Sequence, residues 1–171
     1  MAGDALLRPA VVADVEALAA GMMAGLAEYP AFARPGWRAP AVADEEAHLR
    51  DLLADPGVWA CVAEVDGRIA GQIMLVPADR AARPVADPGL MHLRNLFVDK
   101  AYWGGGLAVA LHAAALDAAR ERGYVAMRLF VATGQERARR FYAREGWEPA
   151  GEPFHDPAPD LELIELRRPV S

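Results

Sequence analysis

The stretch that decides the fold is LRNLFVDKAYWGGGLAVALHAAALDAARER, residues 93–122. It starts with an apolar run typical of a buried strand, passes through the glycines of residues 104–106, and then becomes almost wholly apolar. The last part predicts a long helix from about Leu107 to Arg122, with basic residues in its last turn and Gly123 just beyond. We therefore expect a strand, a glycine loop and a helix in direct succession.

The glycine loop favours binding of a phosphate. Glycines let the backbone approach a ligand closely, and the helix behind them presents unpaired N–H groups and about half a positive charge. This attraction does not require a lysine or arginine in the loop. Three glycines are equally compatible with a flexible turn, so the neighbouring residues have to identify the ligand.

Two common phosphate-binding fingerprints do not fit this loop. A nucleoside triphosphate loop needs Gly-Lys followed by Ser or Thr, whereas Leu107 and Ala108 follow the glycines here. A dinucleotide fingerprint needs another glycine at the position of Val109 and an acid near the end of the next strand, which closes with Leu129-Phe130-Val131. The sequence therefore argues against both classes of nucleotide.

Hydrophobic spacing and turn residues predict further elements on either side of this unit. The first part of the chain is predicted to form a helix over 15–26, a proline-rich loop over 29–40 and a helix from Asp44 to just before Asp55. Strands over 58–65 and 68–76, joined by Asp66-Gly67, follow, and a loop over 77–89 leads to the strand over 90–98. After the glycine loop and its helix come a strand over 125–131, a helix ending at Gly146 and a last strand over 161–167. Thr133 and Glu136 match a capping box at the start of the fourth helix. Hairpins before a strand–helix–strand crossover imply an α/β protein with a mixed sheet and helices on both faces.

Composition indicates a globular protein, because 54% of the residues are hydrophobic and 25% are charged. The net charge of −6 argues against a nucleic-acid partner. No apolar run approaches the ~20 residues of a membrane span, and Asp4 and Arg8 interrupt the N-terminus before a signal-peptide core forms. The single cysteine, Cys61, argues against internal disulfides and cysteine-based zinc sites. We therefore expect a soluble, cytoplasmic protein with no metal and no nucleic-acid or membrane partner.

Two segments resemble the signatures of the GNAT N-acetyltransferase superfamily. The run from Leu96 to Asp99 and the loop from Tyr102 to Ala108 resemble its first signature, whose loop pattern is R/Q-x-x-G-x-G/A. Trp103 stands where Arg or Gln is usual, so we expect phosphate binding there to depend on backbone N–H groups rather than on a cationic side chain. The run from Gln135 to Trp147 resembles the second signature, N-x-x-A-x-x-[FL]-Y-x-x-x-G-[FW], with Gln135 in place of the asparagine.

The resemblance covers the whole chain, since residues 6–10 are similar to the usual first strand of the family. It implies a single GNAT-like domain over residues 1–171, with a mixed, mostly antiparallel sheet of about seven strands. It also implies that the strands over 90–98 and 125–131 splay apart to admit the pantetheine of acetyl-CoA. The residues expected to bind this co-substrate are Leu96, Phe97, Val98, Trp103, Gly104, Gly105, Gly106, Leu107, Ala108 and Gln135.

Tyr142 resembles the family's general acid. Gln135, Ala138 and Tyr142 stand at i, i+3 and i+7, so they share one face of the predicted helix. Tyrosine has a pKa near 10 and a simple thiol one near 8.5, so full proton transfer to a departing sulfur would be uphill unless the site lowers the tyrosine's pKa. A stabilising hydrogen bond to the sulfur is the safer description.

The amine acceptor is less well specified. The candidate contacts are Tyr29, Trp37, Glu64, His92 and Asn95. The aromatic residues of the 29–40 loop would form one wall of the acceptor pocket and residues 154–156 the other, although the same aromatics would equally serve to seal the core. Glu64, His92 and Glu28 are the candidates for removing a proton from the amine, and none is favoured over the others.

The expected activity is transfer of an acetyl or longer acyl group from acetyl-CoA to a primary amine, by direct attack in a ternary complex. The acceptor is a small molecule or a protein amine, and a homodimer is one option for the assembly. A non-catalytic acyl-CoA-binding or regulatory module on the same fold is the main alternative. A structural partner protein that uses its aromatic loop is a third reading, and it predicts no coenzyme binding at all.

Overall fold

The computed structural model describes residues 4–171, and within them one eight-stranded sheet carries the fold. Its strands are β1 (Leu6–Pro9), β2 (Trp59–Val65), β3 (Arg68–Pro77), β4 (Leu90–Val98), β5 (Ala126–Ala132), β6 (Glu148–Pro149), β7 (Phe154–Asp156) and β8 (Leu161–Pro169). The order across the sheet is β1-β2-β3-β4-β5-β8-β6, and β7 pairs with β8. The α-helices of the described residues are α1 (Val15–Leu26), α2 (Val42–Ala54), α3 (Leu107–Glu121) and α4 (Glu136–Arg144).

The β2–β3 hairpin turns where the sequence predicts. Asp66 and Gly67 have φ values of 50° and 75°, the left-handed conformation that a two-residue hairpin turn requires at both positions. The other neighbouring strands are also antiparallel, with the exception of β4 and β5. The predicted mixed, mostly antiparallel sheet is therefore confirmed.

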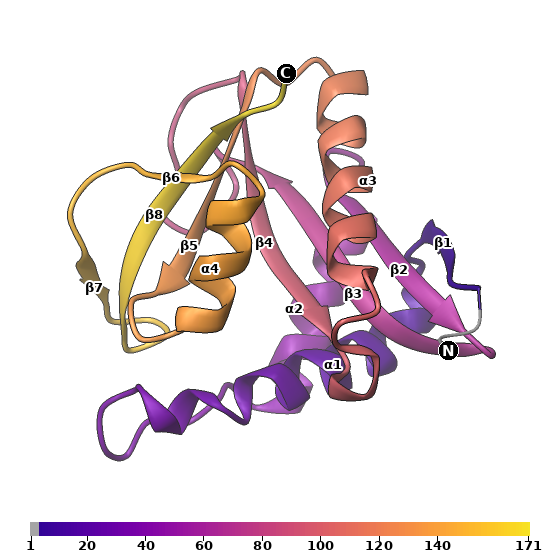
Figure 1. The fold of residues 1–171 in the computed structure, drawn as a ribbon, viewed down its shortest axis with the longest axis horizontal. Helices are drawn as coiled ribbons and strands as arrows, with labels where there is room; N and C mark the ends of the chain where they lie inside the picture. The colour runs from indigo at the N-terminus through magenta and orange to yellow at the C-terminus, as the bar shows by residue number, and fades with distance from the viewer. Residues whose placement is uncertain (1–3) are drawn as a thin grey trace.

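The parallel pairing of β4 and β5 is short. It joins Leu90 to Ala126, Met91 to Met127 and His92 to Arg128, and beyond these pairs the two strands diverge, as Figure 1 shows. The crossover between them is α3, as the sequence predicts for a strand–helix–strand unit. The sheet thus contains a wedge-shaped gap at its centre.

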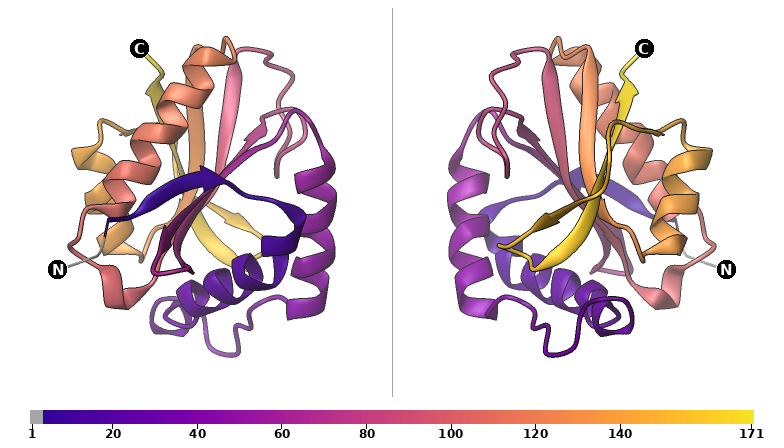
Figure 2. Two further views of the ribbon diagram at one scale, coloured as in Figure 1. Left: turned by 90° about the vertical axis from the view of Figure 1, so that its right-hand side faces the viewer. Right: turned by 90° about the vertical axis from the view of Figure 1, so that its left-hand side faces the viewer.

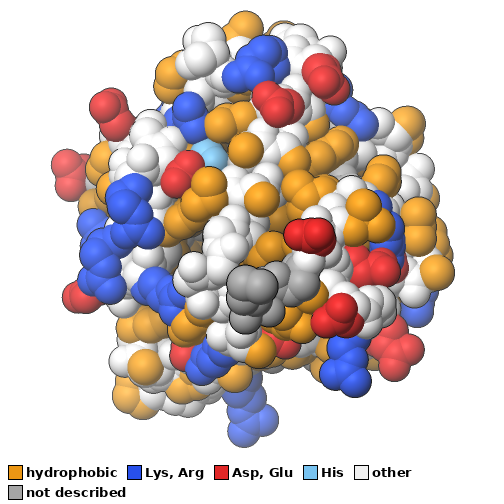
Figure 3. All heavy atoms as spheres, turned by 45° about the vertical axis from the view of Figure 1, so that its right-hand side comes forward, with side chains coloured by type: hydrophobic (Ala, Val, Ile, Leu, Met, Phe, Trp, Pro, Cys, Tyr) orange, Lys and Arg blue, Asp and Glu red, His pale blue; other side chains and the backbone are white. Residues whose placement is uncertain are grey.

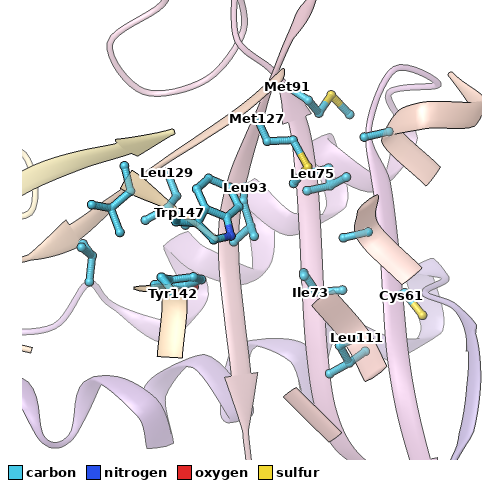
Figure 4. Close-up of a cluster of buried hydrophobic side chains, with 14 of the residues drawn as sticks. Cys61, Ile73, Leu75, Met91, Leu93, Leu111, Met127, Leu129, Tyr142 and Trp147 are labelled. Carbon is cyan, nitrogen blue, oxygen red and sulfur yellow. The ribbon is translucent and has the colours of Figure 1, made fainter. Parts of the chain in front are cut away.

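Helices cover both faces of the sheet, with α1 and α2 on one side and α3 and α4 on the other (Figure 2). The larger core lies under α3 and α4 and includes side chains of β2 to β5. Leu111 of α3 lies beside Ile73 of β3 within it (Figure 4). A smaller core under α1 and α2 includes Leu18, Leu49 and Met74. Burying both faces of a sheet in this way explains why its central strands are almost continuously apolar.

Two local expectations are wrong. The capping box is not formed, because α4 begins after Gln135 with no side-chain cap and the Thr133 hydroxyl instead donates a hydrogen bond to Glu162 Oε1 at 2.7 Å. The second helix begins at Val42 rather than at Asp44. In addition, the short strands β6 and β7 bring the described sheet to eight strands rather than about seven.

The outer surface mixes both signs of charge with exposed hydrophobic side chains. On the face drawn in Figure 3, hydrophobic side chains occupy much of the centre and basic side chains gather along the left edge.

None of the helices in residues 4–171 has the length and hydropathy needed to cross a membrane. Cys61 is buried in the larger core, where a small apolar side chain is favoured.

Candidate active site

A cleft of about 1100 Å³ opens at the end of β4 that is not paired with β5. We call it the main cleft. Its lining comes from the β2–β3 hairpin, the end of β4, the loop before α3 and parts of α1, α3 and α4. From the loop and helices the lining includes Trp103, Gly104, Gly106, Gln135, Arg137 and Tyr142.

The free edge of β4 faces this cleft. The Asp99 N–H donates to the Ala70 carbonyl of the β3 side at 2.9 Å, and successive residues of a strand direct their backbone groups to alternate sides. The backbone groups of Leu96 and Val98 therefore face the gap, whereas those of Phe97 face β3. This edge offers hydrogen bonds to a ligand that carries amides.

Two glycines of the loop before α3 are favoured by their positive φ angles and not by crowding from neighbouring atoms. Gly104 and Gly106 have φ values of 80° and 84°, and a Cβ at either would meet no atom within 4 Å. Gly106 is the N-cap of α3, and no side chain caps this helix. The first N–H groups of α3 therefore keep their hydrogen-bonding capacity, as an anion site at a helix N-terminus requires.

Trp103 is held against both the strand and α4. Its indole N–H donates to the Val98 carbonyl at 2.8 Å, and the guanidinium carbon of Arg137 lies 3.2 Å from the centre of its ring. Lys100 approaches the same ring at 5.6 Å. Sequence reasoning did not identify Arg137, because it stands two positions after Gln135 and so off the helix face that the spacing defined.

Tyr142 lines the main cleft and belongs to the larger core (Figure 4). Burial raises the pKa of its phenol above the ordinary value of 10.0, and its hydroxyl has no hydrogen-bond partner among residues 4–171. Its ring packs 5.7 Å from that of Trp147, whose indole N–H donates to His112 Nε2 at 2.8 Å. The ring is thus fixed in place while its hydroxyl is free to donate to a ligand.

The Tyr29 side chain contacts Gln135 at the start of α4. Its hydroxyl donates to Gln135 Oε1 at 3.2 Å, and its ring packs against Phe32 and Trp37 at 4.9 and 5.5 Å. Trp37 in turn donates its indole N–H to the Pro159 carbonyl at 2.6 Å. These aromatic side chains belong to a small hydrophobic cluster that includes residues of β7 and β8, so the two predicted walls of the acceptor pocket are in contact.

His92 and Asn95 are buried on the α1–α2 side of the sheet and do not line the main cleft. Burial and the charges of Arg128 and Arg94 lower the pKa of His92 from 6.5 to about 3. Neither His92 Nδ1 nor either polar atom of the Asn95 side chain has a hydrogen-bond partner in the described residues. Buried polar atoms without partners are rare in proteins and mark positions where a ligand or water can bind.

The acidic candidates are both in ion pairs. Glu64 lines the main cleft and accepts a hydrogen bond from Arg8 at 2.8 Å, whereas Glu28 pairs with Lys100 at 2.5 Å. The main cleft therefore brings together the predicted coenzyme residues, with the exception of Gly105, and also Glu28, Glu64 and Tyr142. Trp37, His92 and Asn95 stand apart from it, and Tyr29 adjoins it through Gln135.

Residues 24–147 match the family model described as the acetyltransferase (GNAT) family. The match covers more than half of the chain. The chain belongs to this family. The family and the fold expected from the sequence are thereby confirmed, and membership supports an acyltransferase enzyme. In residues 4–171 no three His, Cys, Asp or Glu side chains are grouped as a metal site.

Curated relatives agree with this membership. N-acetyltransferase 8 of Mus musculus is 36% identical over 104 residues, which cover 58% of this chain and 42% of the mouse protein. An uncharacterized N-acetyltransferase of Mycobacterium tuberculosis is 32% identical over 102 residues, which cover 60% of each chain. The matches thus span about half the length of these relatives.

Solved structures share the fold. Ribosomal-protein-alanine N-acetyltransferase from Brucella melitensis superposes with a TM-score of 0.73 at 22% identity, covering 96% of this chain and 99% of that one. The PaiA N-acetyltransferase from Thermoplasma acidophilum, whose structure is a complex with coenzyme A, has a TM-score of 0.73 at 16% identity, covering 95% of this chain and 98% of that one. At these identities the likeness concerns the fold.

Proposed function

We propose that this protein transfers an acetyl group from acetyl-CoA to a primary amine by direct attack of the amine on the thioester. One observation carries the proposal. The main cleft joins a strand edge, a helix N-terminus without a side-chain cap behind a glycine loop, and a fixed tyrosine whose hydroxyl has no partner among the described residues. These are the groups needed to bind an amide-containing arm, a pyrophosphate and a departing sulfur.

The residues present fit coenzyme A. Leu96 and the Val98 N–H on the β4 edge would pair with the pantetheine amides, whereas the Val98 carbonyl already accepts the Trp103 indole N–H. The N–H groups around Gly106 would hold the pyrophosphate. Gln135 would donate its side-chain amide N–H groups to the same arm, while its Oε1 accepts the Tyr29 hydroxyl. Bound acetyl-CoA supplies an acyl carbon activated as a thioester, and the chain supplies position and hydrogen bonds.

Tyr142 would act as a hydrogen-bond donor to the sulfur. Because burial raises the pKa of Tyr142, its phenol stays protonated at physiological pH and is a weaker acid than a thiol. A hydrogen bond that strengthens as negative charge develops on the sulfur lowers the barrier without complete proton transfer. This agrees with the more cautious of the two roles expected from the sequence.

The acceptor amine must lose a proton before it attacks, because an alkylammonium has a pKa near 10.4. His92, with a pKa of about 3, is a weak base and is better suited to accept a hydrogen bond at Nδ1. Glu64 lines the cleft and is partly exposed beside Arg8. We therefore propose Glu64, acting through water, as the group that receives the proton. His92 and Asn95, which do not line the main cleft, are given no contact with the acceptor.

The test is release of free thiol from acetyl-CoA in the presence of a panel of amines that includes small amines, free amino acids and peptides with a free N-terminus. Amine-dependent thiol release is the expected result. Coenzyme binding without turnover across the panel would support the non-catalytic module. A thermal unfolding curve unmoved by coenzyme A would reject both readings and favour a structural partner protein.

A further inference from the structure

The glycine loop lacks the basic residue that would neutralise a pyrophosphate, and the structure brings one to it from another element. Arg137 lies in the first turn of α4, yet its guanidinium stacks on Trp103, the residue directly before Gly104. The two residues are separated by a helix and a strand in the sequence. Both line the main cleft.

Arg137 keeps its charge and its donors available. It makes no ion pair within 4.0 Å among the salt bridges of residues 4–171, whereas Lys100, the other cation near the ring, is paired with Glu28. A guanidinium that stacks by its face keeps the N–H donors around its edge free for an anion. The aromatic ring also limits the conformations of a long side chain, so less entropy is lost when a ligand binds.

We propose that Arg137, oriented by Trp103, binds the pyrophosphate of coenzyme A and replaces the cationic loop side chain that Trp103 displaces. The assignment rests on the proposed function, because it requires the cleft to bind the coenzyme. The proposal differs from the expectation that binding at this site depends on backbone N–H groups rather than on a cationic side chain. Bringing one positive charge to the cleft matters more in a chain whose net charge is −6, since that excess repels a polyanion.

The experiment is calorimetric titration of the full chain with coenzyme A, 3′-dephospho-coenzyme A and pantetheine. The Arg137→Ala variant should bind both phosphorylated ligands about 10-fold more weakly, the lower range for hydrogen bonds to charged groups, and pantetheine as wild type does. The difference should shrink at high ionic strength. Arg140→Ala is the matched control, because Arg140 is an exposed arginine of the same helix that pairs with Glu136 and does not line the main cleft.

The role of Trp103 is tested separately. Trp103→Phe keeps a ring under Arg137 and should bind nearly as wild type does, whereas Trp103→Leu should approach the Arg137→Ala value. The double variant should be no weaker than Arg137→Ala, because Trp103 acts through Arg137. Additive losses would overturn this dependence.

Two results would overturn the assignment itself. If Arg137→Ala binds coenzyme A as tightly as wild type does, Arg137 does not contact the ligand. If its loss appears with coenzyme A and not with the dephosphorylated form, Arg137 binds the 3′-phosphate instead. Failure of the wild-type chain to bind coenzyme A is a different outcome, since it rejects the proposed function. Far-ultraviolet circular dichroism shows whether each variant is folded.

Discussion

Burial of Tyr142 places a neutral phenol in the lining of the main cleft. We predict that Tyr142→Phe lowers kcat by ~10–100-fold, at or below the range for a group that assists proton transfer. The dissociation constant for coenzyme A should stay close to the wild-type value, because the ring and its packing against Trp147 remain. Steady-state kinetics and calorimetry measure the two quantities. Tyr124→Phe is the control, since Tyr124 loses the same hydroxyl outside the cleft. An unchanged kcat would remove Tyr142 from the mechanism.

At the scale of secondary-structure elements, the 29–40 loop and the β7–β8 hairpin are held together by side-chain contacts. Besides the Trp37–Pro159 hydrogen bond, Arg34 donates to Asp160 at 2.8 Å. We predict that Trp37→Ala increases amide hydrogen exchange in both segments, because the contact that joins them is lost. Arg38→Ala, an exposed change in the same loop, should leave exchange unaltered. A higher acceptor KM with unchanged exchange would instead support a wall of the acceptor pocket.

At the scale of the whole molecule, two buried histidines make stability depend on pH. The folded-state pKa is about 3 for His92 and about 4 for His112, both below the ordinary value of 6.5. Below pH 6.5 the unfolded chain therefore binds protons that the folded chain does not, so the free energy of unfolding falls as the pH drops toward 4. Burial is the main cause of the lowered pKa of His112, and the charge of Arg168 adds to it.

Urea unfolding between pH 7 and pH 5 measures this dependence, over a range in which most carboxylates stay ionised. His112→Gln should flatten the curve while retaining an acceptor for the Trp147 indole. His48→Gln should leave it unchanged, because His48 is exposed. A wild-type curve that is flat over this range would contradict the prediction.

Short-range patterns predicted the elements, and contacts between distant residues account for what was missed. The Asp66-Gly67 turn and the helix start at Leu107 follow from neighbouring residues alone. The capping box does not form because the Thr133 hydroxyl donates its hydrogen bond to Glu162 of β8. The stacking of Arg137 on Trp103 has no local signal, since it depends on how α4 docks beside the loop.

The burial of Asn95 also could not be predicted from the alternation of side chains between the two faces of a strand. The register between β3 and β4 shifts where Leu75 pairs with Leu93 and Met74 with Asn95. The extra residue in β4, Arg94, turns toward α2 and bonds Glu45 at 2.7 Å. A bulge of this kind changes which side chains face the core. A strict two-residue repeat of side-chain direction along β4 therefore does not predict which face of the sheet Asn95 occupies.

The three residue pairs that join β4 to β5 leave the sheet as two halves connected at one end. A molecule bound in the gap would touch both halves and act as a cross-link between them. Its binding free energy would then add to the stability of the folded state by mass action. With coenzyme A as that molecule, as the proposed function has it, the amount of folded protein would rise with the supply of the coenzyme.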